Sequence, residues 1–183
     1  NIGSRHLQGI IKSKIPYNVY VIEKSNMSIN LAKKRILEVG GSEKNIFFFK
    51  KFNFSKKKFN LLICATNSNK RYKLIYKILL KYKIENIIIE KIAFQNLKQF
   101  EKALAIVNRK KIKSWVNCSR REQQVYNYVK RKIKKFEKIS LKITGFKWNI
   151  ASNSINFINL YRFIKNNKRI FNIKFNTLKK IKS

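Results

Sequence analysis

Residues 59–148 alternate between short apolar runs and segments of helical period, and this alternation constrains the fold most strongly. The expected strands lie at 61–66, 86–94, 111–116 and 138–146, and the expected helices at 70–83, 97–107 and 125–136. Two βαβ-type units in one small sheet predict an α+β fold, a ferredoxin-like β-α-β-β-α-β sandwich. The helix at 97–107 then becomes a long, partly helical insertion between the second and third strands.

The last of these strands has the clearest pattern. Ile139, Leu141 and Ile143 alternate with polar residues, as a half-buried strand requires. The flanking regions are expected to be extensions, 1–58 at the N-terminal side and a basic 149–183 at the C-terminal side, around a domain at 59–148. Within them, 17–22 predicts a short strand and 157–164 a helix. A further helix is expected from an N-cap at Ser28 to a stop at Gly40-Gly41.

The net charge of the chain indicates which class of partner it binds. There are 44 Lys and Arg residues against 8 acidic residues, all of them Glu, which gives a formal net charge of +36 on 183 residues. Nucleic acid offers the highest density of fixed negative charge, and an acidic lipid surface is a weaker alternative. Part of this excess of lysine is typical of AT-rich genes. The scarcity of acids argues against carboxylate-based enzymes and hard-metal sites.

Few residues suggest cofactor or metal chemistry. Cys64 and Cys118 stand alone, which predicts reduced cysteines and no zinc site. His6 is the only histidine, and no acid lies near it in sequence. No cofactor is expected. No apolar run has the length of a membrane-spanning helix, and no targeting signal is expected.

One segment resembles a known family. Residues 114–123 read Ser-Trp-Val-Asn-Cys-Ser-Arg-Arg-Glu-Gln, similar to the Ser-Pro-His-Val-Asn-Lys-x-Ser-Arg-Glu-Gln signature of the universal small-subunit ribosomal protein ten family. The matching positions are Val116-Asn117, Ser119 and Arg121-Glu122-Gln123, with Arg120 as an insertion and Trp115 in place of the Pro-His pair. The resemblance covers 59–148. It implies a ferredoxin-like sandwich whose long hairpin enters the RNA of the small-subunit head, beside other head proteins, with no catalytic role.

The candidate RNA-binding residues follow from charge and from this resemblance. Arginine forks at the start of a helix suit phosphate oxygens, and an exposed tryptophan can stack on a base. The alternatives remain open: a capping box formed by Ser119 and Glu122, a tryptophan packed under the sheet, and lysines on an ordinary solvated helix face. The candidates are Lys73, Lys77, Lys81, Lys110, Lys111, Lys113, Trp115, Asn117, Arg120 and Arg121.

The sequence therefore predicts a structural, non-enzymatic constituent of an organellar small ribosomal subunit. Its expected partners are ribosomal RNA and neighbouring small-subunit proteins, with no small-molecule substrate, and its expected location is the mitochondrion, or else a plastid or an AT-rich endosymbiont. The alternatives are another organellar ribosomal protein, an accessory subunit of a mitochondrial membrane complex, and an RNA-processing factor. The last would need a glycine-rich phosphate loop, and only a segment before Asn1 could supply one.

Overall fold

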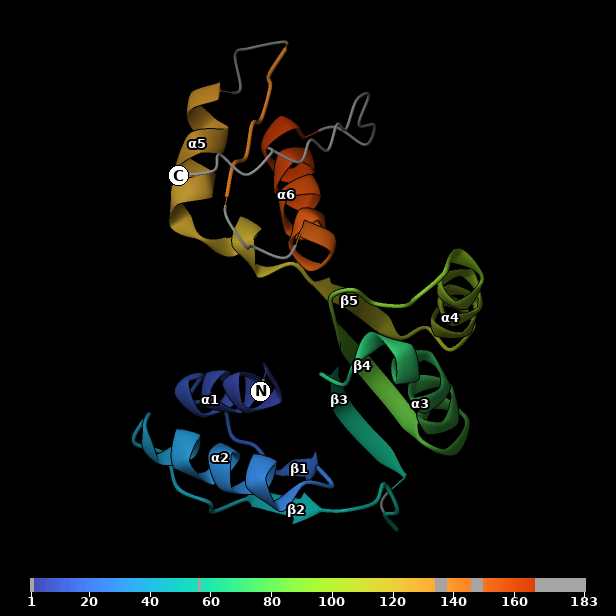
Figure 1. The fold of residues 1–183 in the computed structure, drawn as a ribbon. Helices are drawn as coiled ribbons and strands as arrows, with labels where there is room; N and C mark the ends of the chain where they lie inside the picture. The colour runs from blue at the N-terminus through green and yellow to red at the C-terminus, as the bar shows by residue number, and fades with distance from the viewer. Residues whose placement is uncertain (1, 56, 134–137, 146–149, 167–183) are drawn as a thin grey trace, which may run out of the picture. The chain divides into compact units, whose positions relative to one another are not determined.

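The computed structural model describes residues 2–55, 57–133, 138–145 and 150–166. The chain divides into two compact units, residues 1–117 and 118–183, and each is described separately. Figure 1 shows the helices and strands of both units. The predicted boundaries at 58 and 148 concern independent folding and stay a prediction.

The first unit consists of two halves, and helices and strands alternate within each half. Its first half consists of α1 (Ile2–Lys12), β1 (Val19–Ile22), α2 (Asn26–Leu37) and β2 (Ile46–Phe49). Its second half consists of β3 (Lys58–Cys64), α3 (Ser68–Lys81), β4 (Lys83–Glu90), α4 (Leu97–Arg109) and β5 (Lys113–Asn117). β1 and β2 form a two-stranded parallel sheet, and β3, β4 and β5 form a three-stranded parallel sheet in that order.

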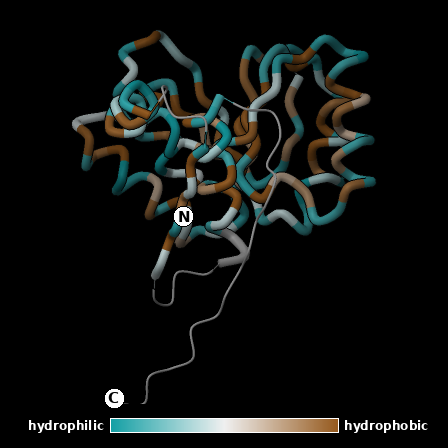
Figure 2. The backbone as a smooth tube through the Cα atoms, turned by 90° about the horizontal axis from the view of Figure 1, so that it is seen from above, coloured by the Kyte–Doolittle hydropathy of each residue, from teal (hydrophilic) through white to brown (hydrophobic). Residues whose placement is uncertain are grey.

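The pattern of apolar residues explains how the second half of the first unit forms its core. β4 has its isoleucines on both faces, and Ile87 is fully buried, as in a parallel sheet covered on both sides. α3 turns Ile75, Ile78 and Leu79 into the same core. α4 adds Ala103 and Val107 to this core. Apolar and polar residues alternate along the backbone in Figure 2, as these amphipathic elements require.

The first half has its own smaller core of Leu7, Ala32, Ile36 and Ile46. α2 begins after Ser25, whose side chain accepts a hydrogen bond from the Ser28 backbone N–H at 3.2 Å, so the cap is Ser25 rather than Ser28. After α2 the chain turns through Gly40, whose φ of 70° lies in the left-handed region that glycine adopts without strain. The predicted stop at the glycine pair is confirmed.

The ferredoxin-like prediction is wrong, because the strands of this unit pair in parallel. A ferredoxin-like sandwich needs an antiparallel hairpin between its second and third strands, whereas β4 and β5 are parallel and are connected through α4. The segment predicted as an insertion is therefore a crossover helix. In addition, residues 138–145 form no strand, and residue 146, at the end of that prediction, lies outside the described residues. Alternation alone supplies no neighbouring strand to pair with.

The described part of the second unit contains a short 3₁₀ helix and two α-helices. These are η1 (Ser119–Glu122), α5 (Gln124–Ile133) and α6 (Ile150–Lys165). α6 buries Leu160 and Ile164. The Arg120 guanidinium lies 4.6 Å from the centre of the Phe157 ring and the Lys130 ammonium 4.2 Å from that of Phe163, so cation–π contacts connect η1 and α5 to α6.

Candidate functional site

The carboxyl ends of the parallel strands carry a set of polar side chains in the first unit. Glu23 follows β1, Thr66 and Asn67 follow β3, Glu90 ends β4, and Asn117 ends β5. In open parallel sheets, ligands bind outside the carboxyl ends of the strands, where the strand order changes direction. Here the chain builds outward from β1 to β2 and then from β3 to β5, so this edge is the candidate site.

Glu90 is the centre of one polar cluster at this edge. Its Oε1 atom lies 2.7 Å from Nε2 of His6 in α1 and accepts a second hydrogen bond from the side-chain amide of Asn117. The side chain is buried, with 5% of the residue exposed. Burial alone would raise the pKa of Glu90, but the hydrogen bonds from His6 and Asn117 outweigh it and hold the pKa below its ordinary value. An ionised carboxylate thus links α1 to β4 and β5.

Arg71 orders the two loops that follow β3 and β4. This α3 residue is 3% exposed, and its guanidinium donates hydrogen bonds to backbone carbonyls after β3 and at the end of β4. The acceptors are the carbonyl oxygens of Thr66, Glu90, Ile92 and Ala93. Burial lowers the pKa of Arg71, while the electrostatic effects of Cys64 and Glu90 oppose that change. The guanidinium therefore fixes the backbone where a ligand would approach.

Glu23 lies at the end of the other half-sheet. Its backbone N–H donates to the carbonyl of Phe49 at 2.9 Å, which extends the β1–β2 pairing by one residue. Its carboxylate Oε1 accepts a hydrogen bond from the backbone N–H of Ser25 at 3.0 Å, and the residue is half-buried. The carboxylate is thereby positioned between the end of β1 and the start of α2.

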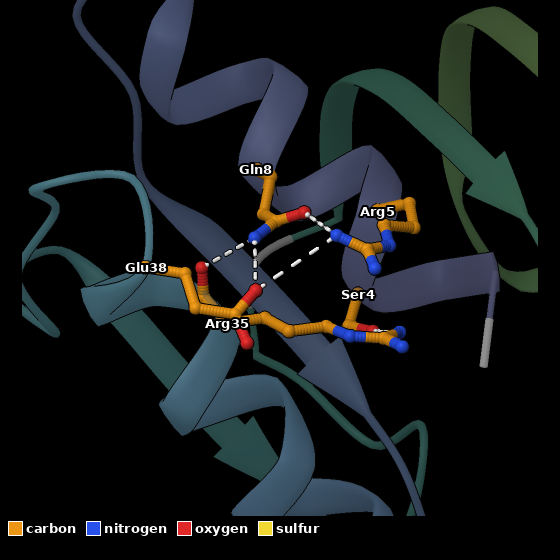
Figure 3. Close-up of polar contacts among 5 residues, drawn as sticks. All are labelled: Ser4, Arg5, Gln8, Arg35 and Glu38. Atoms are coloured by element: carbon orange, nitrogen blue, oxygen red, sulfur yellow. Dashed lines mark hydrogen bonds and ion pairs between the residues drawn. The ribbon is translucent and has the colours of Figure 1, made fainter.

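A second polar network fixes α1 against α2 (Figure 3). The Gln8 side-chain amide donates to the Arg35 carbonyl at 2.7 Å and to Oε2 of Glu38 at 3.1 Å. Arg35 in turn donates to the Ser4 hydroxyl at 2.6 Å, and Arg5 donates to Oε1 of Gln8 at 2.8 Å. Three of these four bonds join residues about 30 positions apart, so sequence periodicity could not reveal them.

The predicted RNA-binding lysines lie elsewhere on the first unit. A cavity of about 840 Å³ opens at the amino ends of the strands, and its lining includes Lys57, Lys81, Lys83, Lys110, Lys111 and Lys113. Two of these have intraprotein partners, since Lys81 donates to Asn53 at 2.9 Å and Lys110 donates to the Leu79 carbonyl. Lys73 and Lys77 line a separate hollow beside Tyr72 and Tyr76 on α3.

The other predicted residues are not brought together with them. Trp115 is 46% exposed on β5, so it does not pack under the sheet. Asn117 lies at the carboxyl edge and donates to Glu90, whereas Arg120 and Arg121 belong to the second unit. Arg121 pairs with the carboxylate of Glu122 at 2.9 Å, and Ser119 opens a 3₁₀ helix without a side-chain cap, so the capping box does not form. An anion-binding role for these residues stays a prediction.

The remaining sequence expectations concern metals, cysteines and membranes. Cys64 and Cys118 are buried, and neither forms a disulfide. Within the described part of the chain, no three histidine, cysteine or acidic residues cluster as a metal site would require. Over the same residues, no helix combines the length and apolarity needed to span a bilayer. His6, which has no acid near it in sequence, forms a hydrogen bond with Glu90 across 84 positions of sequence.

The fold is similar to that of several solved structures. A probable dehydrogenase from Thermotoga maritima matches with a TM-score of 0.64 and 11% identity, over 91% of this chain and 52% of that one. The super-repressor mutant of Gal80p from Saccharomyces cerevisiae matches with a TM-score of 0.63 and 10% identity, over 90% and 48%. The probable oxidoreductase yhhX matches with a TM-score of 0.61 and 12% identity, over 87% and 49%.

These similarities define the class of fold. The chain has a Rossmann-type parallel fold, and it spans about half the length of each of these structures. Neither protein-family models nor curated protein sequences give a match.

The ribosomal interpretation is therefore wrong. The chain shares its fold with dehydrogenase, oxidoreductase and Gal80p structures rather than with ribosomal protein ten. The predictions that depended on that family are overturned with it: the small-subunit role, the RNA and ribosomal-protein partners, the non-enzymatic class and the absence of a small-molecule ligand. The short match at residues 114–123 spans the end of β5 and η1, where its helix-opening role is not fulfilled. The mitochondrial, plastid or endosymbiont origin stays a prediction.

Proposed function

We propose that residues 2–117 form the nucleotide-binding part of an oxidoreductase-type protein, with a nicotinamide dinucleotide bound across the carboxyl edge of the parallel strands. The observation that carries this proposal is Glu23, a half-buried carboxylate immediately after β1. In dinucleotide-binding Rossmann folds, an acidic residue about 20 positions beyond the glycine-rich turn accepts hydrogen bonds from the ribose hydroxyls. The descriptions of two similar structures as a probable dehydrogenase and a probable oxidoreductase support the same class.

The residues present fit such a ligand. The Glu23 carboxylate is held by the Ser25 N–H through Oε1 and can accept hydrogen bonds from vicinal hydroxyls. The first turn of α1 contains no acidic residue, so the positive end of this helix favours a pyrophosphate. Because a carboxylate repels the 2′-phosphate of NADP, the site should prefer NAD. When bound, the nicotinamide supplies hydride-transfer chemistry.

The chain's own groups then have separate tasks. Arg71 holds the loops after β3 and β4 through its backbone acceptors, and the Glu90–His6 contact keeps α1 beside β4. Lys91 directly follows Glu90 and is half-buried at this edge. A lysine ammonium in that place can donate the proton that accompanies reduction of a carbonyl group. The substrate itself would contact parts that these 117 residues do not include.

Calorimetric titration with NADH tests the proposal. The wild-type chain should bind NADH saturably, and Glu23→Gln should weaken binding by about tenfold or more, because a neutral amide is a poorer acceptor for two hydroxyls. Glu43→Gln is the matched control, since Glu43 pairs with Lys33 on the surface and should bind as the wild type does. Equal affinity in the Glu23 and Glu43 variants would contradict the role of Glu23.

A non-catalytic nucleotide-dependent regulator is the second candidate. It is favoured by the similarity to Gal80p, whose matching structure is described as a super-repressor mutant. Both candidates bind the cofactor, but only the enzyme needs Lys91 as a proton donor. If Lys91→Met leaves NADH affinity unchanged and abolishes NADH-dependent reduction by the whole protein, the enzyme is supported. A whole protein that binds NADH without any turnover of carbonyl substrates supports the regulator.

A further inference from the structure

The cavity at the amino ends of β3, β4 and β5 has a role that the cofactor site does not explain, and we call it the amino-edge cavity. Its volume of about 840 Å³ is within the range of small-ligand sites. Lys58, Lys83 and Lys113 are the first residues of these three strands. Because parallel strands begin at the same edge of a sheet, the three lysines come to one edge, and the register pairs Lys58 with Lys83 directly.

The positive charge of the amino-edge cavity exceeds the negative charge of its described lining. The lining contains six lysines and one glutamate. That carboxylate, Glu85, is already occupied, since Oε1 pairs with the Lys58 ammonium at 2.7 Å and Oε2 accepts from the Asn60 side-chain amide at 2.8 Å. The hydrogen bonds from Lys58 and Asn60 hold the pKa of Glu85 below its ordinary value. The C-terminal ends of α3 and α4 together add about one negative charge, which leaves a surplus of about four positive charges.

The lysines of the lining differ in what they contact. Lys81 and Lys110 donate hydrogen bonds within the protein. The side chains of Lys111 and Lys113 form no hydrogen bond, ion pair or ring contact with another described residue. Lys83 forms no side-chain hydrogen bond to the described residues either, and its charge only helps to lower the pKa of the neighbouring Glu85. Three ammonium groups of one cavity are therefore available to a ligand.

The backbone of Lys111 shows that the fold alone does not require a lysine there. Its φ is 53°, in the left-handed region, directly after the end of α4. Its N–H donates to the Asn108 carbonyl at 3.0 Å, and the next N–H donates to the Val107 carbonyl at 2.8 Å. Glycine is the usual residue at such a helix end, because a side chain has a steric cost in this conformation. The side chain that this chain keeps at that position lines the amino-edge cavity.

The lining offers charge without a surface for a nucleobase. Tyr82, the aromatic residue among the described lining, is 3% exposed, and the Lys57 and Lys81 ammonium groups lie 5.7 and 5.5 Å from the centre of its ring. Trp115 is exposed on β5 but does not belong to the lining. Proteins that bind single-stranded nucleic acid stack its bases on exposed aromatic rings. The cavity is therefore suited to phosphate groups rather than to bases.

We propose that the amino-edge cavity binds a short inorganic polyphosphate, a compact anion with three or more negative charges, through Lys83, Lys111 and Lys113. Each lysine ammonium is a point charge with three donors, which suits terminal phosphate oxygens. A cleft lined by one sign of charge also raises the local concentration of such an anion. NADH, with a single charge on each of its two phosphates, is a weaker ligand for this cavity. The site lies at the opposite edge from the proposed cofactor site and does not depend on it.

Titration of the full chain with inorganic tripolyphosphate, followed by the backbone amide shifts of Lys83 and Lys113, tests the site. Lys111→Gly should weaken binding about threefold in low salt, because one exposed charge is removed. Lys14→Gly is the matched control, since Lys14 also has a positive φ, 59°, just after a helix, and is exposed outside the cavity. Both variants lose one charge and place glycine at a left-handed position, so the Ile87 amide should stay protected from hydrogen exchange in both.

Three outcomes would overturn the proposal. One is the absence of saturable shifts at Lys83 and Lys113, or equal affinity in Lys111→Gly and Lys14→Gly, which would leave only the net charge. Another is ATP shifting these amides at a concentration tenfold or more below that of tripolyphosphate, which would assign the cavity to a nucleotide recognised through its base. The third is displacement of tripolyphosphate by NADH, which would place both anions in one site. A lack of NADH binding would contradict the proposed function and leave the polyphosphate site in place.

Discussion

Replacing Arg71 with methionine should unfold the carboxyl edge more easily, and the size of the effect can be worked from its contacts. The guanidinium donates to the carbonyls of Thr66, Glu90, Ile92 and Ala93. Thr66 and Ile92 are exposed, so water can replace the lost donor there. Glu90 and Ala93 are buried, at 5% and 8% exposed. An unsatisfied buried carbonyl costs roughly 1–3 kcal/mol, so two of them cost about 2–6 kcal/mol.

Two effects reduce that value. Methionine does not carry the desolvation cost of a buried charge, and Nε of Arg71 has no hydrogen-bond partner even in the native chain. The net loss expected for Arg71→Met is therefore about 2–4 kcal/mol. The control is Arg109→Met at the exposed end of α4, where the favourable interaction of a cation with the helix C-terminus is worth about 0.3–1 kcal/mol.

Hydrogen exchange of the β4 amides is the suitable assay, because the chain has two compact units and a single unfolding midpoint would mix them. The opening free energy of Ile87 and Ile89 should fall by about 2–4 kcal/mol in Arg71→Met and by no more than about 1 kcal/mol in Arg109→Met. A loss below about 1 kcal/mol in Arg71→Met would contradict the dependence of the buried carbonyls on Arg71. It would mean that these carbonyls find other donors once the guanidinium is gone.

Two further predictions concern charge. The pKa of Glu90 is held below the ordinary value of 4.5, so this carboxylate stabilises the fold above that pH, and the contribution is lost as the pH falls through the lower folded-state pKa. The opening free energy of the β4 amides, measured by hydrogen exchange, should therefore fall more from pH 7 to pH 3 in the wild type than in Glu90→Gln; parallel curves would contradict it. At the opposite edge, Lys111→Gln combined with Lys113→Gln should weaken binding of inorganic tripolyphosphate several-fold in low salt, whereas Lys44→Gln combined with Lys98→Gln, exposed and outside the cavity, should not. Equal weakening in both pairs would show that only the net charge matters.

The sequence allowed most helices and strands of the first unit to be predicted, but not their arrangement. The expected helices at 70–83 and 97–107 correspond to α3 and α4, and the expected strands at 86–94 and 111–116 to β4 and β5. Local periodicity reports which face of an element is buried, and this information was sufficient for each element. It does not report which neighbour an element pairs with.

The signal for parallel pairing was nevertheless present. A helix of 11 residues or more between two apolar strands is typical of a crossover, because parallel strands cannot be joined by a short turn. The 97–107 segment meets that condition, but the ferredoxin-like interpretation makes it an insertion between the second and third strands. The alternating segment at 138–146 was wrongly predicted as a strand. Its described part at 138–145 has the pattern of a strand but no neighbouring strand to pair with.

Most of the candidate site could not be predicted from the sequence. His6 and Glu90 are 84 positions apart, and Arg71 acts through backbone carbonyls, which have no sequence pattern. Glu23 is different, because an acidic residue directly after a predicted strand at 17–22 was visible in the sequence. The high net charge instead favoured lysines as candidate binding residues, and several of these lie at the amino edge.

The most direct test of the central claim is to map NADH binding by backbone amide chemical shifts in the first unit. If the dinucleotide binds as proposed, NADH shifts the amides at the carboxyl ends of the strands, above all those of Glu23, Ser25 and Thr66, and leaves those of Lys83 and Lys113 at the amino ends unchanged. Shifts confined to the amino ends would contradict it, because the dinucleotide would then bind the lysine-lined cavity and the carboxyl edge would not be the ligand site.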